Sequence, residues 1–289
     1  MTCPICDDAG WKTIEVDGVS RVTRCDCWYT ASAHRRVTEA DIPPRYRNCD
    51  LDSFNDYNDS LSAAVGKARK FVKEFPAVEK GLVFMGGSGL GKTHLAIACL
   101  KLAAHEKGLR GLFFDTRQLL RRIRQTYDPS TRETDRDVID PALTADLLVL
   151  DDLGAERATD WVEETLHLIV NTRYNERRAT IFTTNYPLEA PADVKYAEVL
   201  IERVGFRMLS RLHEMCEFVE LKGVDYRELP SKASPDDFAK LDRKGSATHK
   251  DLPSPSHKTQ ARARLRTQAA PASAPARDLK WSGGKAGNS

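Results

Sequence analysis

Short apolar runs separated by longer amphipathic segments dominate the chain from residue 81 to about residue 222. Continuous apolar runs are typical of strands that are buried on both faces of a parallel sheet. Helical segments between such strands cover the two faces of the sheet. The pattern therefore predicts an α/β fold with a parallel sheet flanked by helices. The runs are Leu82–Met85, Gly111–Asp115, Leu147–Leu150, Thr180–Thr184 and Glu217–Leu221.

The helices are predicted from the spacing of their apolar residues. Residues 61–75 carry apolar side chains at every third or fourth position, which predicts an amphipathic helix before the first strand. A second helix is expected from His94 to His105, and a basic one over Arg117–Tyr127. A short helical stretch is expected after residue 31. The paired prolines Pro43 and Pro44 interrupt any helix, so a linker is expected near residues 31–45.

Other segments depart from this alternation. Residues 12–24 alternate around Asp17-Gly18, which is typical of a β-hairpin. The segment Arg132–Asp140 is too highly charged for core and is expected to be an insertion. Residues 231–289 are rich in Ser, Pro, Ala, Lys and Arg. They cannot bury enough apolar surface to offset their chain entropy, so they are expected to be disordered.

A phosphate-binding pattern follows the first apolar run. Residues 86–93 read Gly-Gly-Ser-Gly-Leu-Gly-Lys-Thr and match G-x-x-x-x-G-K-[ST] in the strand–loop–helix context that the pattern requires. The glycines let backbone N–H groups turn toward a phosphate chain, and the helix N-terminus adds positive potential. Lys92 would reach the β- and γ-phosphates, and the Thr93 hydroxyl would bind Mg²⁺. The residues expected to hold ATP here are Gly86, Gly87, Ser88, Gly89, Leu90, Gly91, Lys92, Thr93 and His94.

Two carboxylates end the third apolar run. Chemistry in an open α/β sheet collects at the carboxyl ends of the strands. Asp151 would hold Mg²⁺, and Asp152 would orient the attacking water. An aspartate at this second position is short, so slow hydrolysis is expected. Asn185, at the end of the next run, would contact the γ-phosphate or the water.

Two arginine patterns are candidates for contacts beyond this site. Arg207 and Arg211 lie four residues apart, so they share one helical face. They are either a solvated surface or a finger for a neighbouring subunit's γ-phosphate. Arg121, Arg122 and Arg124 make a basic helix, which is a candidate contact for single-stranded nucleic acid. Tyr127 is expected to be the only nearby aromatic residue that could stack on a base.

The cysteines gather near the start of the chain. Four of the seven form the pairs Cys3/Cys6 and Cys25/Cys27, and the expected hairpin lies between the pairs. A hairpin brings both pairs to one end, where four thiolates can close a tetrahedral Zn²⁺ site. The second pair is tighter than the usual C-x-x-C, so His34 or Cys49 could replace one ligand. Unligated cysteines and a redox pair are the alternatives.

Charge and hydropathy limit the partners and the cellular compartment that are expected for this chain. The net charge is only +2, but residues 231–289 carry twelve Lys and Arg against five Asp, including Arg262, Arg264 and Arg266. The tail is therefore basic, and it is either solvated or a weak contact for nucleic acid or an acidic partner. No apolar run approaches the ~20 residues of a membrane helix, and the N-terminus lacks signal-peptide features. A reducing cytoplasm is expected, with no membrane partner.

These residues together resemble the DnaC/IstB-like branch of AAA+ ATPases, over about residues 42–227. The resemblance implies a five-stranded sheet of order 5-1-4-3-2. It also implies that Asn185 is a sensor-1 residue, that Arg211 is a finger with Arg207 as its companion, and that Arg227 is a candidate sensor-2 residue. Adenine contacts would come from residues 42–54. The matching elements are Ile42–Tyr46, Phe84–Thr93, Leu147–Gly154, Asn171–Tyr174, Thr180–Asn185, Arg207–Leu212 and Asp225–Arg227.

The cysteine module is similar to the zinc-binding head of some DnaC-type loaders, where it engages the helicase, whereas IstB-type helpers usually lack it. The expected domains are a zinc-binding domain and linker at 1–45, an AAA+ domain at 46–230 and a basic tail at 231–289. The expected function is an ATP-dependent loader of a replicative ring helicase that binds single-stranded DNA and self-assembles as a hexamer or a spiral. The alternatives are a transposition helper that acts on target DNA and an ATP-switched zinc adaptor.

Overall fold

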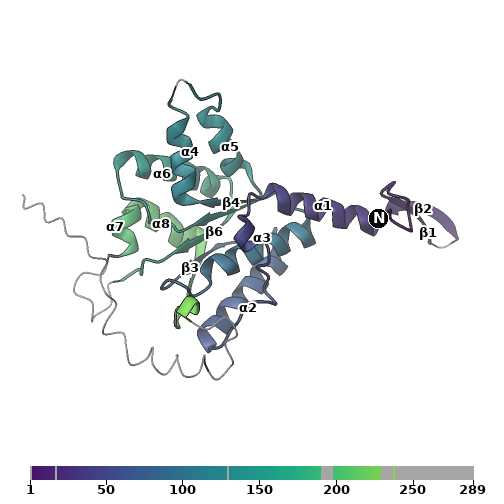
Figure 1. Ribbon diagram of the computed structural model, residues 1–289, viewed down its shortest axis with the longest axis horizontal. Helices are drawn as coiled ribbons and strands as arrows, with labels where there is room; N and C mark the ends of the chain where they lie inside the picture. Colours follow the sequence, from purple (N-terminus) through teal and green to yellow (C-terminus); the bar gives the residue numbers. More distant parts are fainter. Residues whose placement is uncertain (1, 17, 129, 190–197, 229–236, 238–289) are drawn as a thin grey trace, which may run out of the picture. The chain divides into compact units, whose positions relative to one another are not determined.

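Five parallel strands form the central sheet of the computed structural model in the spatial order β4-β5-β6-β3-β7 (Figure 1). Counted along the chain after the N-terminal hairpin, this order is 5-1-4-3-2, as the family resemblance implied. The structure describes residues 2–16, 18–128, 130–189, 198–228 and 237. The strands are β3 (Gly81–Met85), β4 (Gly111–Asp115), β5 (Leu147–Asp151), β6 (Ala179–Thr184) and β7 (Cys216–Glu220).

The register of the strands brings polar residues together at their carboxyl ends. Asp115 of β4 pairs with Asp151 of β5, and Met85 of β3 pairs with Thr184 of β6. The phosphate-binding loop leaves β3 at the same edge. Chemistry-bearing residues from four segments of the chain therefore meet at one edge of the sheet, as expected for parallel strands.

Two helices cover one face of the sheet. They are α2 (Asp59–Glu74) and α3 (Lys92–Lys107), and they bury their apolar sides against alternate strand residues such as Leu82, Phe84 and Val149. Asn58 caps α2 by accepting a hydrogen bond from the Leu61 amide. The predicted helices at 61–75 and 94–105 are confirmed, with ends shifted by one to two residues.

The opposite face carries the other helices of the domain. The intervening strand residues, such as Val83, Leu148 and Phe182, point into this second core cluster. Alternation between two buried faces explains why the strands read as continuous apolar runs. The helices are α4 (Thr116–Gln125), α5 (Asp135–Thr144), α6 (Asp160–Asn175), α7 (Leu200–Val204) and α8 (Phe206–Met215).

Two local predictions were incomplete. The segment Arg132–Asp140 was excluded from the core, yet α5 begins within it and buries Val138 and Ala142. A capping box between Thr134 and Asp137 starts this helix. The charged residues of its first turn face solvent. For that reason the apolar residues of its one buried side were not recognised from the sequence.

The N-terminal region contains more helix than the expected linker. A hairpin of β1 (Trp11–Val16) and β2 (Val19–Arg24) is followed by α1 (Asp26–Glu39), which begins before residue 31 and continues almost to the prolines. The Ala40 carbonyl after α1 accepts a hydrogen bond from the Phe113 amide of edge strand β4. Short 3-10 helices follow at Pro44–Tyr46 and Tyr226–Glu228. Among the described helices, none is both long and apolar enough to cross a bilayer.

Candidate functional site

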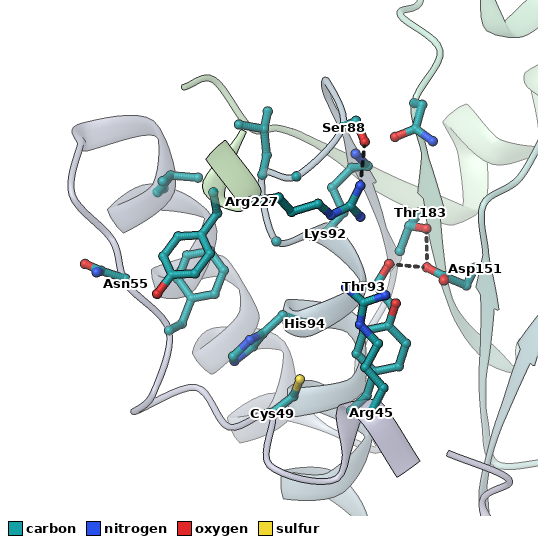
Figure 2. Close-up of a pocket in the computed structure, with 18 of the residues that line it drawn as sticks. Arg45, Cys49, Asn55, Ser88, Lys92, Thr93, His94, Asp151, Thr183 and Arg227 are labelled. Carbon is teal, nitrogen blue, oxygen red and sulfur yellow. Dashed lines mark hydrogen bonds between the residues drawn. The ribbon is translucent and has the colours of Figure 1, made fainter. Parts of the chain in front are cut away.

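A cavity of about 530 Å³ opens at the carboxyl edge of the sheet, around the loop between β3 and α3 (Figure 2). The loop needs glycine at two contact points. Gly89 has φ +72°, and a Cβ there would lie 1.6 Å from Asp225 Oδ1. Gly91 has φ +85°, and a Cβ there would lie 2.5 Å from the Phe54 ring. Glycine therefore allows both flanking segments to close onto the loop.

Lys92 begins α3, and its amine lies inside the loop. Its Nζ donates hydrogen bonds to the carbonyl oxygens of Gly86 and Gly87 at 2.9 and 2.6 Å. Burial lowers the pKa of Lys92 to about 8, although the nearby Asp152 and Asp151 carboxylates act in the opposite direction. A buried ammonium at the start of a helix suits a polyanionic ligand.

Asp151 ends β5, and two threonine hydroxyl groups donate to its carboxylate (Figure 2). Its Oδ1 accepts hydrogen bonds from Thr93 Oγ1 at 2.8 Å and from Thr183 Oγ1 at 2.6 Å. Burial raises the pKa of Asp151, and the charges of Asp152 and Asp115 add to this effect. A carboxylate and an adjacent hydroxyl are hard oxygen donors of the kind that Mg²⁺ prefers, so the predicted pair Thr93 and Asp151 fits this ion.

Asp152 and Asn185 are brought together as the sequence suggested. Asn185 Nδ2 donates to Asp152 Oδ1 at 2.7 Å. The Asp152 backbone has φ 58°, and its amide donates to Thr183 Oγ1 at 2.9 Å. This hydrogen bond holds Asp152 in a left-handed conformation that aspartate tolerates better than most residues. The carboxylate thus faces the cavity next to a polar side chain from the neighbouring strand.

Sequence reasoning missed Asp115 as a member of this site. It ends β4 and lines the same cavity as Asp151 and Asp152. The available signal was its position, because it ends the strand beside β5 in the sheet and therefore shares the carboxyl edge.

Residues 225–227, after the last strand of the sheet, close onto the loop. Arg227 Nη1 donates to Ser88 Oγ at 3.1 Å, and the Tyr226 amide donates to the Gly89 carbonyl at 3.1 Å. The Asp225 carboxylate accepts from the Arg227 amide at 2.9 Å. Arg227 therefore lines the cavity beside Ser88 (Figure 2), and its role as a sensor residue stays a prediction.

Residues from the segment before α2 form the other wall. Tyr46, Phe54 and Tyr57 line the cavity, and Phe54 meets His94 edge-on at 5.3 Å between ring centroids. Lys101 of α3 anchors this segment by donating to the carbonyls of Arg47 and Cys49 at 2.7 and 2.9 Å. Aromatic rings at this wall would suit a planar base. The adenine contact expected from residues 42–54 stays a prediction.

Arg207 and Arg211 lie elsewhere. They line a separate groove with Glu163 and His167 of α6. Arg211 Nε donates to Asn171 Oδ1 at 2.9 Å, while Arg207 is exposed. Neither arginine lines the nucleotide cavity of its own chain. A role in nucleotide chemistry would therefore require a second copy.

A basic and aromatic cluster caps the far end of α4. The Arg124 guanidinium lies 4.6 Å from the centre of the Trp161 ring, and Trp161 Nε1 donates to the Tyr127 hydroxyl at 3.2 Å. Arg121 is exposed, whereas Arg122 is engaged by Glu133 at 2.6 Å. Sequence reasoning named Tyr127 as the only nearby aromatic residue; this was wrong, because α6 brings Trp161 beside it. The two residues are 34 positions apart, so no local pattern could reveal the pair.

The four early cysteines converge. The Sγ atoms of Cys3, Cys6, Cys25 and Cys27 all lie within 4.8 Å of one another, with Cys3 and Cys25 separated by 3.8 Å. A tetrahedral ion with metal–sulfur bonds of about 2.3 Å separates its sulfurs by about 3.8 Å, so the cluster fits. A hydrogen bond from the Ile5 amide lowers the pKa of Cys3 to about 7, whereas the contact with the Cys6 thiol raises that of Cys27.

The structure tests one of the two residues that could have replaced a zinc ligand, Cys49, but not the other, His34. Cys49 belongs to the buried core between the central sheet and its helices and lies outside the cysteine cluster. The His34 side chain lies outside the described part of the structure, as do Arg262, Arg264 and Arg266 of the tail.

Comparison with known proteins places this geometry in a family. The model of the IstB-like ATP binding proteins matches residues 49–234. The replicative helicase loader DnaC of Escherichia coli K12 is 27% identical over 175 residues, which is 60% of this chain and 68% of that protein. The phage-like element PBSX protein XkdC of Bacillus subtilis is 22% identical and covers 78% of this chain and 84% of its own length.

Solved structures agree. A crystal structure of the DnaC helicase loader is 40% identical, with a TM-score of 0.55, and covers 62% of this chain and 100% of its own. The crystal structure of DnaI, at 23% identity and a TM-score of 0.53, covers 66% of this chain and 98% of its own and supports the fold alone. The family match, the sheet order and the phosphate-binding loop lead to one conclusion. The chain belongs to the IstB-like ATP-binding proteins, in the DnaC-like group of the AAA+ fold.

Proposed function

We propose that this chain is an ATP-dependent loader of a replicative ring helicase. The observation that carries this proposal is its 40% identity to a solved DnaC helicase loader, over the full length of that structure. The cysteine cluster adds support, because it resembles the zinc-binding head of some DnaC-type loaders, whereas IstB-type transposition helpers usually lack such cysteines. The proposed partners are Mg²⁺-ATP, single-stranded DNA, a ring helicase and further copies of this chain.

Within the proposed ATP site each polar residue has a distinct task. Lys92 exchanges its two loop carbonyls for the β- and γ-phosphates, and the Thr93 hydroxyl and Asp151 hold Mg²⁺. When bound, the ion neutralises charge on the phosphates. Asp152 and Asn185 orient the attacking water, and Arg227 contacts the phosphate end. Arg211, supported by Arg207, completes the site of the adjacent copy.

The proposed DNA contact is the cluster of Arg121, Arg124, Tyr127 and Trp161. Tyr127 is 60% exposed and Trp161 is half-buried, so their rings are accessible to bases. The guanidinium groups supply charge for the phosphate backbone. Stacking on aromatic faces tolerates any base, which suits a loader that acts without sequence preference.

Truncating the stacking residue tests this contact. Trp161→Ala should weaken binding of a fluorescent oligothymidylate by about 5- to 150-fold, because loss of one stacked base costs about 1–3 kcal/mol. Trp161→Phe, which keeps an aromatic face, should retain most of the affinity. Fluorescence anisotropy at fixed salt gives both values. Equal affinity for the wild type and Trp161→Ala would remove this surface from the proposal.

The proposed zinc head is the helicase-binding element. Size-exclusion chromatography with the replicative helicase of the organism that encodes this chain should yield a stable complex in the presence of ATP. The double variant Cys3→Ser, Cys6→Ser should lose the complex while still binding ATP, because its AAA+ core is intact. A wild-type chain that fails to bind this helicase with or without ATP would overturn the loader proposal.

The family model also supports a transposition helper as the second candidate, since it takes its description from IstB. Binding of a transposase encoded beside this gene, together with a preference for double-stranded DNA, would favour that candidate. If neither DNA form changes ATP turnover, an ATP-switched zinc adaptor becomes the better description.

A further inference from the structure

The Thr183 hydroxyl joins the two aspartates that follow one another at the end of β5. Thr183 lies near the end of β6, and it is 1% exposed. Its Oγ1 accepts a hydrogen bond from the Asp152 amide at 2.9 Å and donates one to Asp151 Oδ1 at 2.6 Å (Figure 2). Neither direction can be reversed, because an amide N–H only donates and an ionised carboxylate only accepts. One hydroxyl therefore fixes the Asp151 side chain and the Asp152 backbone together.

The backbone of the turn after Asp151 is held by the same threonine. The Leu153 amide donates to the Thr183 carbonyl oxygen at 2.7 Å. Between these bonds Asp152 has φ 58°, a left-handed conformation that a residue other than glycine keeps only where the surrounding contacts enforce it. Thr183 thus holds the turn through its side chain and its backbone at once.

The two oxygens of the Asp151 carboxylate have different surroundings. Oδ1 accepts two hydrogen bonds, one from Thr183 and one from Thr93 at 2.8 Å. Within the described part of the chain, no hydrogen bond to Oδ2 is formed. The Asp151 side chain is buried but lines the cavity. As long as both hydroxyls hold Oδ1, the carboxylate cannot rotate to present its two oxygens equally to one ion.

The other carboxylates that line the cavity are also engaged through one oxygen. Asp152 Oδ1 accepts from Asn185 Nδ2 at 2.7 Å, and Asp115 Oδ1 accepts from the Gln118 amide at 2.9 Å. Asp115, Asp151 and Asp152 are the three carboxylates of the cavity lining in the part of the chain that the structure describes. None of the three therefore has both oxygens without a donor.

This arrangement matters because divalent cations differ in what they need from a carboxylate. Ca²⁺ takes about six to eight oxygen ligands and often binds both oxygens of one carboxylate. Mg²⁺ is smaller, keeps a near-octahedral shell, and is usually bound through one or two carboxylates together with the phosphates of a nucleotide. A site that offers single carboxylate oxygens and the Thr93 hydroxyl suits the smaller ion.

We propose that Thr183 is a positioning residue that makes the nucleotide site selective for Mg²⁺ over Ca²⁺. Its hydroxyl holds Oδ1 of Asp151 and so keeps this carboxylate from turning both oxygens toward one ion. The larger cation then lacks part of the ligand set that it needs. This inference rests on the proposed binding of Mg²⁺-ATP.

The experiment compares two affinities of the full chain for a fluorescent, non-hydrolysable ATP analogue. One Kd is measured in excess Mg²⁺ and the other in excess Ca²⁺, and their ratio is the readout. In the wild type the Mg²⁺ complex should bind about tenfold tighter, which is the low end of the factor expected for a hydrogen bond to a charged group. A ratio within one protein is informative, because a variant with a generally damaged pocket loses affinity for both complexes.

Variants at Thr183 separate its hydroxyl from its shape. Thr183→Val keeps the shape but removes the hydroxyl, so Asp151 can turn both oxygens toward the ion and the ratio should fall toward one. Thr183→Ser keeps the hydroxyl and should retain the wild-type ratio. Thr183→Ala also lacks the hydroxyl and gives the same comparison if the valine variant does not fold.

Thr184→Val is the matched control. Thr184 is the next residue of β6 and is also fully buried. Its Oγ1 accepts from the Tyr186 amide at 3.2 Å and donates to the Leu153 carbonyl oxygen at 2.8 Å, so it holds the same turn without touching a carboxylate. Thermal unfolding should show similar destabilisation of the two valine variants. Thr184→Val should nevertheless keep the wild-type ratio.

The outcomes distinguish this inference from the proposed function. Equal affinity of the wild type for the two complexes would overturn the selectivity and leave ATP binding intact. A wild-type ratio in the hydroxyl-free Thr183 variants, or an equal loss in Thr184→Val, would remove Thr183 as its determinant. A folded wild type that binds neither complex would overturn the proposed ATP-dependent function, and the selectivity with it.

Discussion

Lys92 and Asp151 carry opposite charges in the same cavity. Burial lowers the pKa of Lys92 and raises that of Asp151, so it favours the neutral form of each side chain. The protein offsets this only in part, with loop carbonyls around the ammonium and two threonine hydroxyls on the carboxylate. A triphosphate and a divalent cation would supply the missing opposite charges. Ligand binding therefore resolves an unfavourable electrostatic arrangement that folding leaves in place.

The Lys92 pKa gives a pH dependence with a definite sign. Because burial lowers it to about 8, the amine loses its charge as the pH rises through 8, and phosphates bind the charged form. ATP affinity should fall about tenfold from pH 7 to pH 9, with proton uptake on binding near pH 8.5. Calorimetry in two buffers of different ionisation enthalpy measures both quantities. Lys92→Arg keeps its charge and should show a nearly flat profile, whereas a flat wild-type profile would contradict the assignment.

Two residues mark the limit of prediction from sequence at this scale. Arg173 is fully buried and donates to Thr180 and to four carbonyl oxygens, including those of Ala142 and Ala145 at the end of α5. Nothing in its immediate sequence announces this role, because its partners come from two other elements. Trp161 was missed for the same reason. The loop residues and Asp151 were predictable because local geometry fixes their chemistry.

At the scale of elements, the strands of the sheet were predicted almost to the residue. The N-terminal module was predicted from its two cysteine pairs. Buried parallel strands give unbroken apolar runs, so their sequence signal is strong. The hairpin of β1 and β2 has no such signal, and Val19 and Val22 are 57% and 68% exposed. Cys25 is the N-cap of α1 and Cys27 lies in its first turn. Among the described residues before Tyr29, Cys25 is the one buried apolar side chain, so in this part of the chain the cysteine cluster joins the hairpin to a helix without an apolar core beneath it.

Metal removal should therefore unfold this module and spare the AAA+ core. We expect about one Zn²⁺ per chain, with a binding free energy of about 10–16 kcal/mol that is largely folding free energy. Chelation should expose residues 2–25 to limited proteolysis, while the thermal transition of the core stays in place. Cys6→Ser should lose the metal, and Cys49→Ala should retain it. A metal-free chain with a protease-resistant N-terminus would contradict this prediction.

At the scale of the whole molecule, the nucleotide cavity of one chain contains the cations Lys92, Arg45 and Arg227 but neither member of the arginine pair. That pair lies in a groove with three acidic side chains of α6, Asp160, Glu163 and Glu164. A head-to-tail contact between copies would bring the arginines to a neighbour's phosphates. It would also bring the acidic groove toward Arg45 and Arg227 of that neighbour's cavity. Such heterologous contacts generate rings or helical assemblies.

Subunit mixing tests this arrangement. Arg211→Ala should lower ATP turnover by about 10³- to 10⁵-fold while leaving ATP binding intact, because a finger acts on the transition state. Lys92→Ala should also be inactive. An equal mixture of the two should recover about a quarter of wild-type turnover, since random assembly joins an intact cavity to an intact arginine at about one interface in four. In the control, Arg211→Ala is mixed with the double variant Lys92→Ala, Arg211→Ala instead of with Lys92→Ala. No copy in this mixture keeps Arg211, so turnover should not recover. Inactive mixtures of the single variants would instead assign Arg211 to its own chain, and full activity of Arg211→Ala would remove it from the reaction.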